Sequence, residues 1–295
     1  MTDHRAASDN ASTLSIGQCA ALATIIEATA PKPGNVQRGA DFEDTSYPDF
    51  IVAATIVAPI FERAATEPLG RTVLAAVDAT QQSVATNTNL GTILLLAPLA
   101  KAPRAADLES AVRTVLANLT DADAYDVYEA IRRAQPGGLG RAAEADVAEP
   151  PRIGLVAAMR LAAEHDMVAR QYAAGFYEVF HCVAPWLESA LAEGLSVSDA
   201  VVRVHLRTMA EFPDSLIARR CGIDVAHQAA GMAAAALEAG QPGDEAYQQA
   251  VADLDFWLRI DGHRRNPGTS ADLVAAGLFV LLRGGIINMP LRLAH

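Results

Sequence analysis

Residues 14–38 read LSIGQCAALATIIEATAPKPGNVQR and show the pattern that decides the fold, an apolar segment that ends in a polar loop with proline and glycine. Leu14, Ala21 and Ile25 recur at helical spacing, and residues 52–60 repeat this spacing in the next segment. Alternation typical of strands is scarce, and the frequent Ala and Leu residues favour helices. The sequence therefore predicts an all-α protein.

The same spacing predicts helices along the whole chain. They are expected at residues 14–29, 48–66, 70–84, 91–101, 105–118, 122–133, 153–165, 167–192, 198–211, 222–239, 244–260 and 270–283. Pro185 is expected to kink or split the segment 167–192. The stretch 135–152, rich in proline and glycine, is the best candidate linker, but polar motifs lie on both sides of it. We therefore expect a single multi-helix domain at 13–285 with a central polar cleft, between a disordered N-terminal tail at 1–12 and a C-terminal tail at 286–295.

The charge balance of the chain bears on its partners and its location. The 295 residues include 35 acidic and 23 basic ones, which gives a net charge of −12, and no dense block of Lys or Arg occurs. Nucleic-acid binding needs a basic surface, so we expect no such partner. The N-terminus is polar, the apolar stretches are short, and the three cysteines form no CxxC pair. These features predict a cytoplasmic protein that is not bound to a membrane.

The first polar segment, residues 27–44, mixes cationic and acidic side chains in the loop after the first predicted helix. Glu27 lies on the last turn of that helix, where a carboxylate opposes the helix dipole and so needs an explanation. Lys32 and Arg38 have the charge to hold phosphates, and Asp41 or Asp44 has the oxygen atoms to hold a metal ion. Taken alone, an ordinary loop with solvated charges is the simpler explanation.

The second polar segment, residues 86–91, precedes an apolar helix and contains Asn87 and Asn89. Short polar side chains at a helix start commonly cap it, and capping is here the simpler explanation. The same helix end, with its free amides and the positive end of the dipole, is also suited to bind an anion.

The third polar segment, residues 213–222, places Asp214 close to the adjacent Arg219 and Arg220. Arginine forms forked contacts with phosphates, so this pair is suited to grip a triphosphate. A surface pair neutralised by nearby acids explains the two arginines equally well.

The fourth polar segment, residues 263–272, opens the last apolar helix. Thr269 and Asp272 have the spacing of a capping box, with Asp where Glu or Gln is usual, and this explains both residues structurally. It leaves Asn266 and its neighbours Arg264 and Arg265 unexplained, and a basic cluster before a helix start suggests anion binding.

Two further patterns are weak. Glu178 and His181 have the spacing of half a dimetal carboxylate site, but the chain has no second Glu-x-x-His. Ser215 follows an Asp but lacks the strand–turn–helix context of a nucleophilic serine.

Taken in order, the four polar segments resemble the triphosphoribosyl-dephospho-CoA synthase family. The stretches that carry the resemblance are EATAPKPGNVQRGADFEDT from Glu27, NTNLG from Asn87, DSLIARRCG from Asp214 and NPGTSADL from Asn266. They follow the family's order at matching separations across residues 20–282. The resemblance implies an all-α transferase of coenzyme and prosthetic-group biosynthesis that uses ATP and Mg²⁺. Such an enzyme moves the triphosphoribosyl group of ATP to a hydroxyl of dephospho-CoA, and adenine leaves.

The resemblance also implies roles for individual residues, since this chemistry needs cations for a triphosphate, a carboxylate near the ribose and a base. It implies Glu27, Asp44 and Asp272 as catalytic groups. It implies Lys32, Arg38, Asn87, Asn89, Arg219, Arg220 and Asn266 as phosphate or nucleotide ligands. It implies Glu27, Asp44 and Asp214 as metal ligands.

Two positions depart from the family pattern. Asn89-Leu90 stands where the family usually has a His-Lys pair, and Gln171 and Ala173 stand in place of a Glu-x-Glu before Gly175. Two alternatives therefore stay open: a nucleotide-dependent enzyme for another coenzyme precursor, such as a pterin cofactor intermediate, and a non-catalytic helical scaffold. A helical phosphohydrolase is disfavoured because its histidine–aspartate pairs are not evident. A homodimer is compatible with the sequence.

Overall fold

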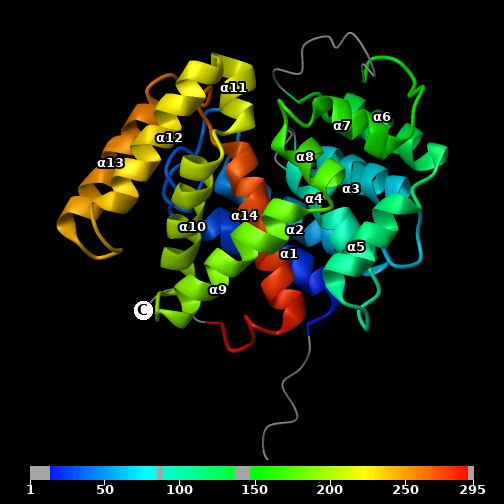
Figure 1. Cartoon of the computed structure of the whole chain (residues 1–295), viewed down its shortest axis with the longest axis horizontal. Coiled ribbons are helices and arrows are strands. Elements are labelled where there is room, and N and C mark those ends of the chain that lie inside the picture. The colour runs from blue at the N-terminus through cyan, green and yellow to red at the C-terminus, as the bar shows by residue number, and fades with distance from the viewer. Residues whose placement is uncertain (1–13, 85–88, 137–146, 292–295) are drawn as a thin grey trace, which may run out of the picture.

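Helix α14, Gly268–Gly284, is apolar on nearly all faces, and such a helix is stable only where other elements cover it. The computed structural model describes residues 14–84, 89–136 and 147–291, and in it α14 runs through the middle of the molecule (Figure 1). Thirteen of its 17 residues are buried. Helix α4, Leu90–Lys101, packs against it and buries 10 of its 12 residues. These two helices form the centre of the fold.

The other helices surround this pair. They are α1 (Ile16–Thr29), α2 (Tyr47–Glu62), α3 (Leu69–Ser83), α5 (Leu108–Ala117), α6 (Asp121–Ala134), α7 (Leu155–Ala162), α8 (Met167–Ala174), the π-helical turn η1 (Val179–Val183), α9 (Ala184–Ala192), α10 (Val197–Glu211), α11 (Ser215–Cys221), α12 (Ile223–Glu238) and α13 (Glu245–Arg259). In Figure 1, α10 to α13 lie on one side of α14, and α3 to α8 lie on the other. The described residues form no strand, only an isolated bridge between Gln37 and Ala40. The all-α prediction is confirmed.

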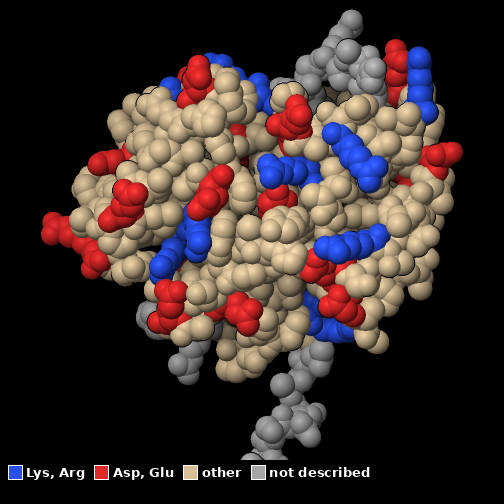
Figure 2. All heavy atoms as spheres, viewed as in Figure 1, with Lys and Arg blue, Asp and Glu red and all other residues tan. Residues whose placement is uncertain are grey.

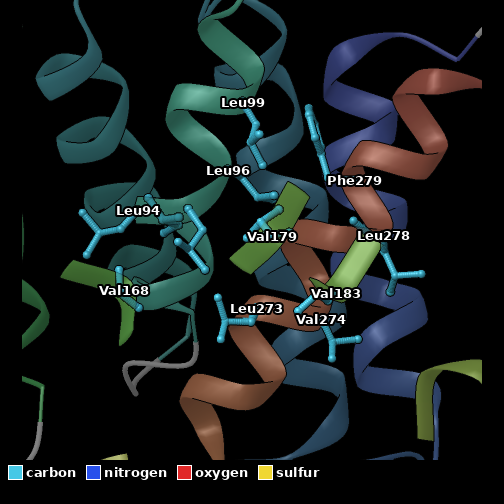
Figure 3. Packing of buried hydrophobic residues seen from close by; sticks show 14 of the residues in the cluster. Leu94, Leu96, Leu99, Val168, Val179, Val183, Leu273, Val274, Leu278 and Phe279 are labelled. Atoms are coloured by element: carbon cyan, nitrogen blue, oxygen red, sulfur yellow. The ribbon is translucent and has the colours of Figure 1, made fainter. Parts of the chain in front are cut away.

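The core is formed where η1 packs between the central helices. Leu96 and Leu99 of α4, Val179 and Val183 of η1 and Phe279 of α14 come together there (Figure 3). Each of these side chains is at most 1% exposed. Removal of this apolar surface from water is the main term that stabilises the arrangement of the helices.

The predicted helix at 167–192 is divided, but not at the position that we expected. Helix α8 ends at Gly175, whose φ of +67° is easily adopted only by glycine, and Phe176 follows with a φ of +64°. The chain then passes through η1 into α9, where Pro185 lies in the first turn. The π-helical turn η1 directly precedes this proline, so the helical hydrogen-bond pattern is already irregular where the N–H of Pro185 is missing. The break is therefore set by Gly175, ten residues before the proline.

Two further segments differ from the sequence-based expectation. Residues 215–221 form the short helix α11 inside the predicted polar loop, and seven residues are too few to show a helical period. Ile287 lies in the predicted C-terminal tail but is only 5% exposed and belongs to the core, so the packed part of the chain extends beyond residue 285.

The surface is charged but mixed. Figure 2 shows acidic and basic side chains interspersed over the face in view, without a continuous basic area on it. A separate observation is that none of the helices in the described ranges combines the length and the apolar composition needed to cross a lipid bilayer.

Gly17 offers a test of the helix packing. A Cβ at this position would lie 2.4 Å from the carbonyl oxygen of Ala58, because α1 and α2 are in close contact. We expect Gly17→Ala to lower the free energy of unfolding by about 1–3 kcal/mol through this clash. Gly231 in α12 is the matched control, since a Cβ there meets nothing within 4 Å. Gly231→Ala should raise the free energy of unfolding by up to about 1 kcal/mol. Urea denaturation measures both values, and an equal stabilisation by the two substitutions would contradict this packing.

Candidate active site

A pocket of about 290 Å³ lies where the N-terminal ends of α4, α7, α8, α11 and α14 meet. First-turn residues of all five helices contribute to its lining. The first turns of α4, α8 and α14 thereby border one cavity, and the positive ends of their dipoles favour a negatively charged ligand there. The volume is near the lower end of the range for small-molecule sites, about 300–1,000 Å³.

The pocket lining has two chemical parts. The apolar lining includes Leu90, Leu94, Ile131, Leu155, Met159 and Val168. The polar lining consists of Glu27, Asn35, Asn89, Thr92, Asp166, Arg219, Arg220, Asn266, Thr269 and Asp272. A ligand that fits both parts carries a flat or apolar group together with charged and hydroxyl groups.

Asp272 lies in the polar lining and approaches the backbone of α4 very closely. A Cβ at position 91 would lie only 2.0 Å from Asp272 Oδ2, so this approach is possible only because residue 91 is a glycine. The hydroxyl of Thr92 donates a hydrogen bond of 2.6 Å to Asp272 Oδ1. Burial, reinforced by the negative charges of Glu27 and Asp214, raises the pKa of Asp272 to about 8. The carboxyl group is therefore mostly protonated at neutral pH.

The capping-box explanation of the fourth polar segment is wrong. Helix α14 begins at Gly268 after Pro267, so Thr269 and Asp272 lie inside its first two turns and do not form a capping box. The Thr269 hydroxyl instead accepts a hydrogen bond from Ser215. Asn89 is the N-cap residue of α4, but its side chain makes no capping hydrogen bond and is buried in the pocket lining. The polar groups at these helix starts therefore face the cavity or a neighbouring helix.

Glu27 and Lys32 form a buried ion pair at the edge of the polar lining. Lys32 Nζ is 2.9 Å from Glu27 Oε1 and also donates to the backbone oxygens of Glu27 at 2.5 Å and Ala30 at 3.4 Å. Three acceptors match the three N–H groups of an ammonium ion, which indicates that Lys32 is protonated. Burial raises the pKa of Glu27, and the Lys32 ammonium opposes this effect. Lys32 itself is fully buried and does not line the pocket, so it is placed to hold Glu27 and not a phosphate.

Arg219 and Arg220 reach the pocket from the end of α11. Arg219 pairs with Asp166 at 2.5 Å, and Asp166 also accepts hydrogen bonds from two amides at the start of α8. Arg220 donates to the backbone oxygen of His263 at 3.1 Å. Within the described ranges no carboxylate lies within ion-pair distance of Arg220, and burial beside Arg219 lowers its pKa. Arg220 is thus a cation in the pocket that lacks a counter-ion, which makes it a candidate anion ligand.

Four of the residues to which the family resemblance assigns a role do not line the pocket. Besides Lys32, these are Arg38, which is exposed, and Asp44, which is about half exposed and 3.7 Å from the His263 ring. The fourth is Asp214, whose carboxylate accepts four hydrogen bonds from α11 and from Ser270. A metal role does not fit Asp214, because both of its oxygens already join α11 to α14. Asn87 lies outside the described residues.

The structure adds pocket residues that sequence reasoning did not select. Asn35 is inside the first family-like stretch, but only the charged neighbours drew attention there. Asp166 is the N-cap residue of α8, and this structural role alone explains an Asp at that position in the sequence. Thr92 gave no signal in the sequence.

The departure at Gln171 lies away from the pocket. Gln171 is buried and donates to Glu178 at 2.9 Å, and Glu178 also pairs with Arg170 at 2.6 Å. His181 bonds to Glu109 at 3.0 Å. Glu178 and His181 therefore have separate protein partners.

The carboxylates of the pocket do not form a ready metal site. Among the residues that the structure describes, no group of three or more His, Cys, Asp or Glu is arranged to hold an ion. Glu27 is paired with Lys32, and Asp166 with Arg219. Mg²⁺ is commonly held by substrate phosphates with only one or two carboxylates, so the ion fits this pocket best as part of a magnesium–nucleotide complex.

Comparisons with known proteins identify the family to which the chain is similar. The sequence model of the ATP:dephospho-CoA triphosphoribosyl transferase family matches residues 13–289. The structure is similar to a crystal structure from Archaeoglobus fulgidus whose protein is assigned as a triphosphoribosyl-dephospho-CoA synthase. The TM-score is 0.61 at 27% sequence identity, over 79% of this chain and 98% of that one. No curated protein matches the chain significantly. The match over nearly the whole length shows that the chain belongs to the ATP:dephospho-CoA triphosphoribosyl transferase family.

Proposed function

We propose that this transferase moves the triphosphoribosyl group of magnesium-bound ATP to a hydroxyl of dephospho-CoA and releases adenine. The observation that carries the proposal is the composition of one pocket. It brings together the unpaired cation Arg220, the Glu27 carboxyl group paired with Lys32, and the protonated Asp272. A scaffold without catalytic function has no need to keep such groups together.

The proposed reaction breaks the bond between ribose C1′ and adenine N9 and forms a bond between C1′ and the acceptor oxygen. The acceptor hydroxyl loses a proton, and the departing adenine gains one. Glu27 is suited to take the first proton and to stabilise positive charge on the ribose, because its partner Lys32 favours the ionised form. Asp272 is suited to supply the second proton, because its surroundings keep it neutral. Two carboxyl groups in different protonation states are the usual basis for such a division of roles.

The remaining groups fit the rest of the nucleotide. Arg220 and Arg219 are proposed to hold the triphosphate, with the helix N-termini adding positive potential. The apolar lining is proposed to receive the adenine ring. Asp44, exposed close to Arg220, is proposed to contact the phosphate-bound Mg²⁺ from outside the pocket.

The acceptor is the part of the reaction for which a second candidate has structural support. Asn89 and Leu90 both line the pocket, and these are the positions where the family's usual His-Lys pair is replaced. A change in groups that face the ligand favours a change in the acceptor, such as another coenzyme precursor.

Incubation with ATP, Mg²⁺ and dephospho-CoA tests the proposed function. We expect free adenine and a dephospho-CoA adduct that carries one triphosphoribosyl group, both detected by mass spectrometry. Omission of Mg²⁺ should abolish both products. Adenine release without the adduct would indicate a different acceptor, and the absence of adenine release would contradict the proposed reaction.

Asp272→Asn tests the role of the neutral carboxyl group. Loss of its proton donor should lower the rate of adenine release by about 10²- to 10⁴-fold. In the wild type, this rate should fall as the pH rises past about 8, where Asp272 ionises. Asp253→Asn, at an exposed position of α13, is the control and should leave the rate unchanged.

The Asp272→Asn variant should also change how the free energy of unfolding depends on pH. The pKa of Asp272 is about 8 in the folded chain and about 3.9 in an unfolded one, so the folded state binds more protons between these values. Each unit of pKa difference is worth about 1.4 kcal/mol, so the wild type should lose stability relative to Asp272→Asn by on the order of 5 kcal/mol as the pH rises from 4 to 8. Denaturation at several pH values measures this difference, and a pH-independent difference would argue against a neutral Asp272.

A further inference from the structure

Asn35 carries a buried polar atom whose lack of a partner calls for an explanation. The residue is 5% exposed and lines the pocket, and its Oδ1 accepts no hydrogen bond from the described part of the chain. A buried acceptor without a donor costs stability and is rare in folded proteins. Such an atom in a pocket lining is explained if a ligand supplies the donor.

The position of Asn35 is fixed by three contacts. Its Nδ2 donates to Asn266 Oδ1 at 2.5 Å, and its backbone oxygen accepts a hydrogen bond from Arg259 of α13. The preceding Gly34 N–H donates to Asp255 Oδ1 at 2.7 Å, and Asp255 in turn pairs with Arg259 at 2.8 Å. The loop after α1 is thereby held against α13, and Asn35 Oδ1 cannot turn to a protein donor without breaking the bond to Asn266.

The chemistry of the surrounding lining indicates which ligand group supplies the donor. Phosphates carry no donor at neutral pH and belong near Arg219 and Arg220. The pocket that Asn35 lines also contains the carboxyl groups of Glu27 and Asp272, and the reacting ribose C1′ must lie within reach of them. The ribose carbon that carries the 2′-hydroxyl is bonded directly to C1′. A ribose hydroxyl is therefore the donor expected at this part of the pocket.

We propose that Asn35 Oδ1 accepts a hydrogen bond from a ribose hydroxyl of the nucleotide, so that Asn35 selects ribonucleotides over deoxyribonucleotides. This inference rests on the proposed function, which places a nucleotide in the pocket. It adds a specificity-determining residue that the charged residues of the site do not supply.

The test compares four nucleotides with the full chain: ATP, 2′-deoxy-ATP, 3′-deoxy-ATP and inosine triphosphate. The 2′-hydroxyl also affects the intrinsic reactivity of the bond to the base, so the informative quantity is the ratio of kcat/KM for ATP to that for the deoxynucleotide, compared between variant and wild type. Asn35→Ala should lower this ratio by about 10- to 100-fold for the nucleotide that lacks the recognised hydroxyl. Asn35→Asp keeps an acceptor oxygen and should retain the wild-type ratio. Asn118→Ala, at an exposed position of α5's C-terminal end, is the control and should behave as the wild type.

The ratio between two nucleotides is independent of the folded fraction, so a partly unfolded variant still gives an answer. A ratio that is unchanged in Asn35→Ala overturns the proposal. So does a loss of discrimination against inosine triphosphate alone, which would assign the donor to the adenine amino group.

Dissociation constants from calorimetry separate this inference from the proposed function. If the wild type releases no adenine but binds ATP with a ribose preference that Asn35→Ala loses, the proposed reaction fails and the role of Asn35 stands. If the wild type binds no nucleotide, both are overturned.

Discussion

The contact between α4 and α14 at Gly91 is the constraint on which the site depends. Asp272 Oδ2 occupies the space that a side chain at position 91 would fill, and Thr92 holds the other carboxyl oxygen. At the opposite end of the same two helices, the Arg283 guanidinium donates to the backbone oxygens of Ala102 and Pro103 at 2.9 Å. Since these contacts join N-terminal end to N-terminal end and C-terminal end to C-terminal end, the two helices run in the same direction. Both positive helix ends therefore point into one pocket, where they favour bound phosphate.

The other polar contacts near the pocket hold this arrangement in place. Asp214 joins α11 to the start of α14 through four hydrogen bonds, which brings the arginines of α11 to the pocket. Lys32 fixes Glu27 at the end of α1. Several charged residues near the site thus act on the structure of their neighbours, while Glu27, Asp272 and Arg220 face the cavity. The chain as a whole is strongly acidic, but its pocket contains the two cationic side chains of Arg219 and Arg220.

The sequence predicted the helical fold well, because apolar spacing depends only on which residues are buried. It also identified six residues that line the pocket, Glu27, Asn89, Arg219, Arg220, Asn266 and Asp272. The sequence-based prediction failed where the same residue type fits two different structural roles. Lys32 resembles a phosphate ligand in a loop, but it is buried against Glu27, and Asp214 resembles a metal ligand, but it caps α11. Asn35 was overlooked because an uncharged amide attracts attention only once its burial and its missing partner are known.

Burial against Gly91 keeps the Asp272 carboxyl group neutral in the pocket. Carboxyl carbon NMR measures this protonation state, with Asp272→Asn used to assign the signal. We expect the Asp272 signal to titrate with a midpoint near 8. A midpoint near 4, the ordinary value for an exposed aspartate, would contradict it.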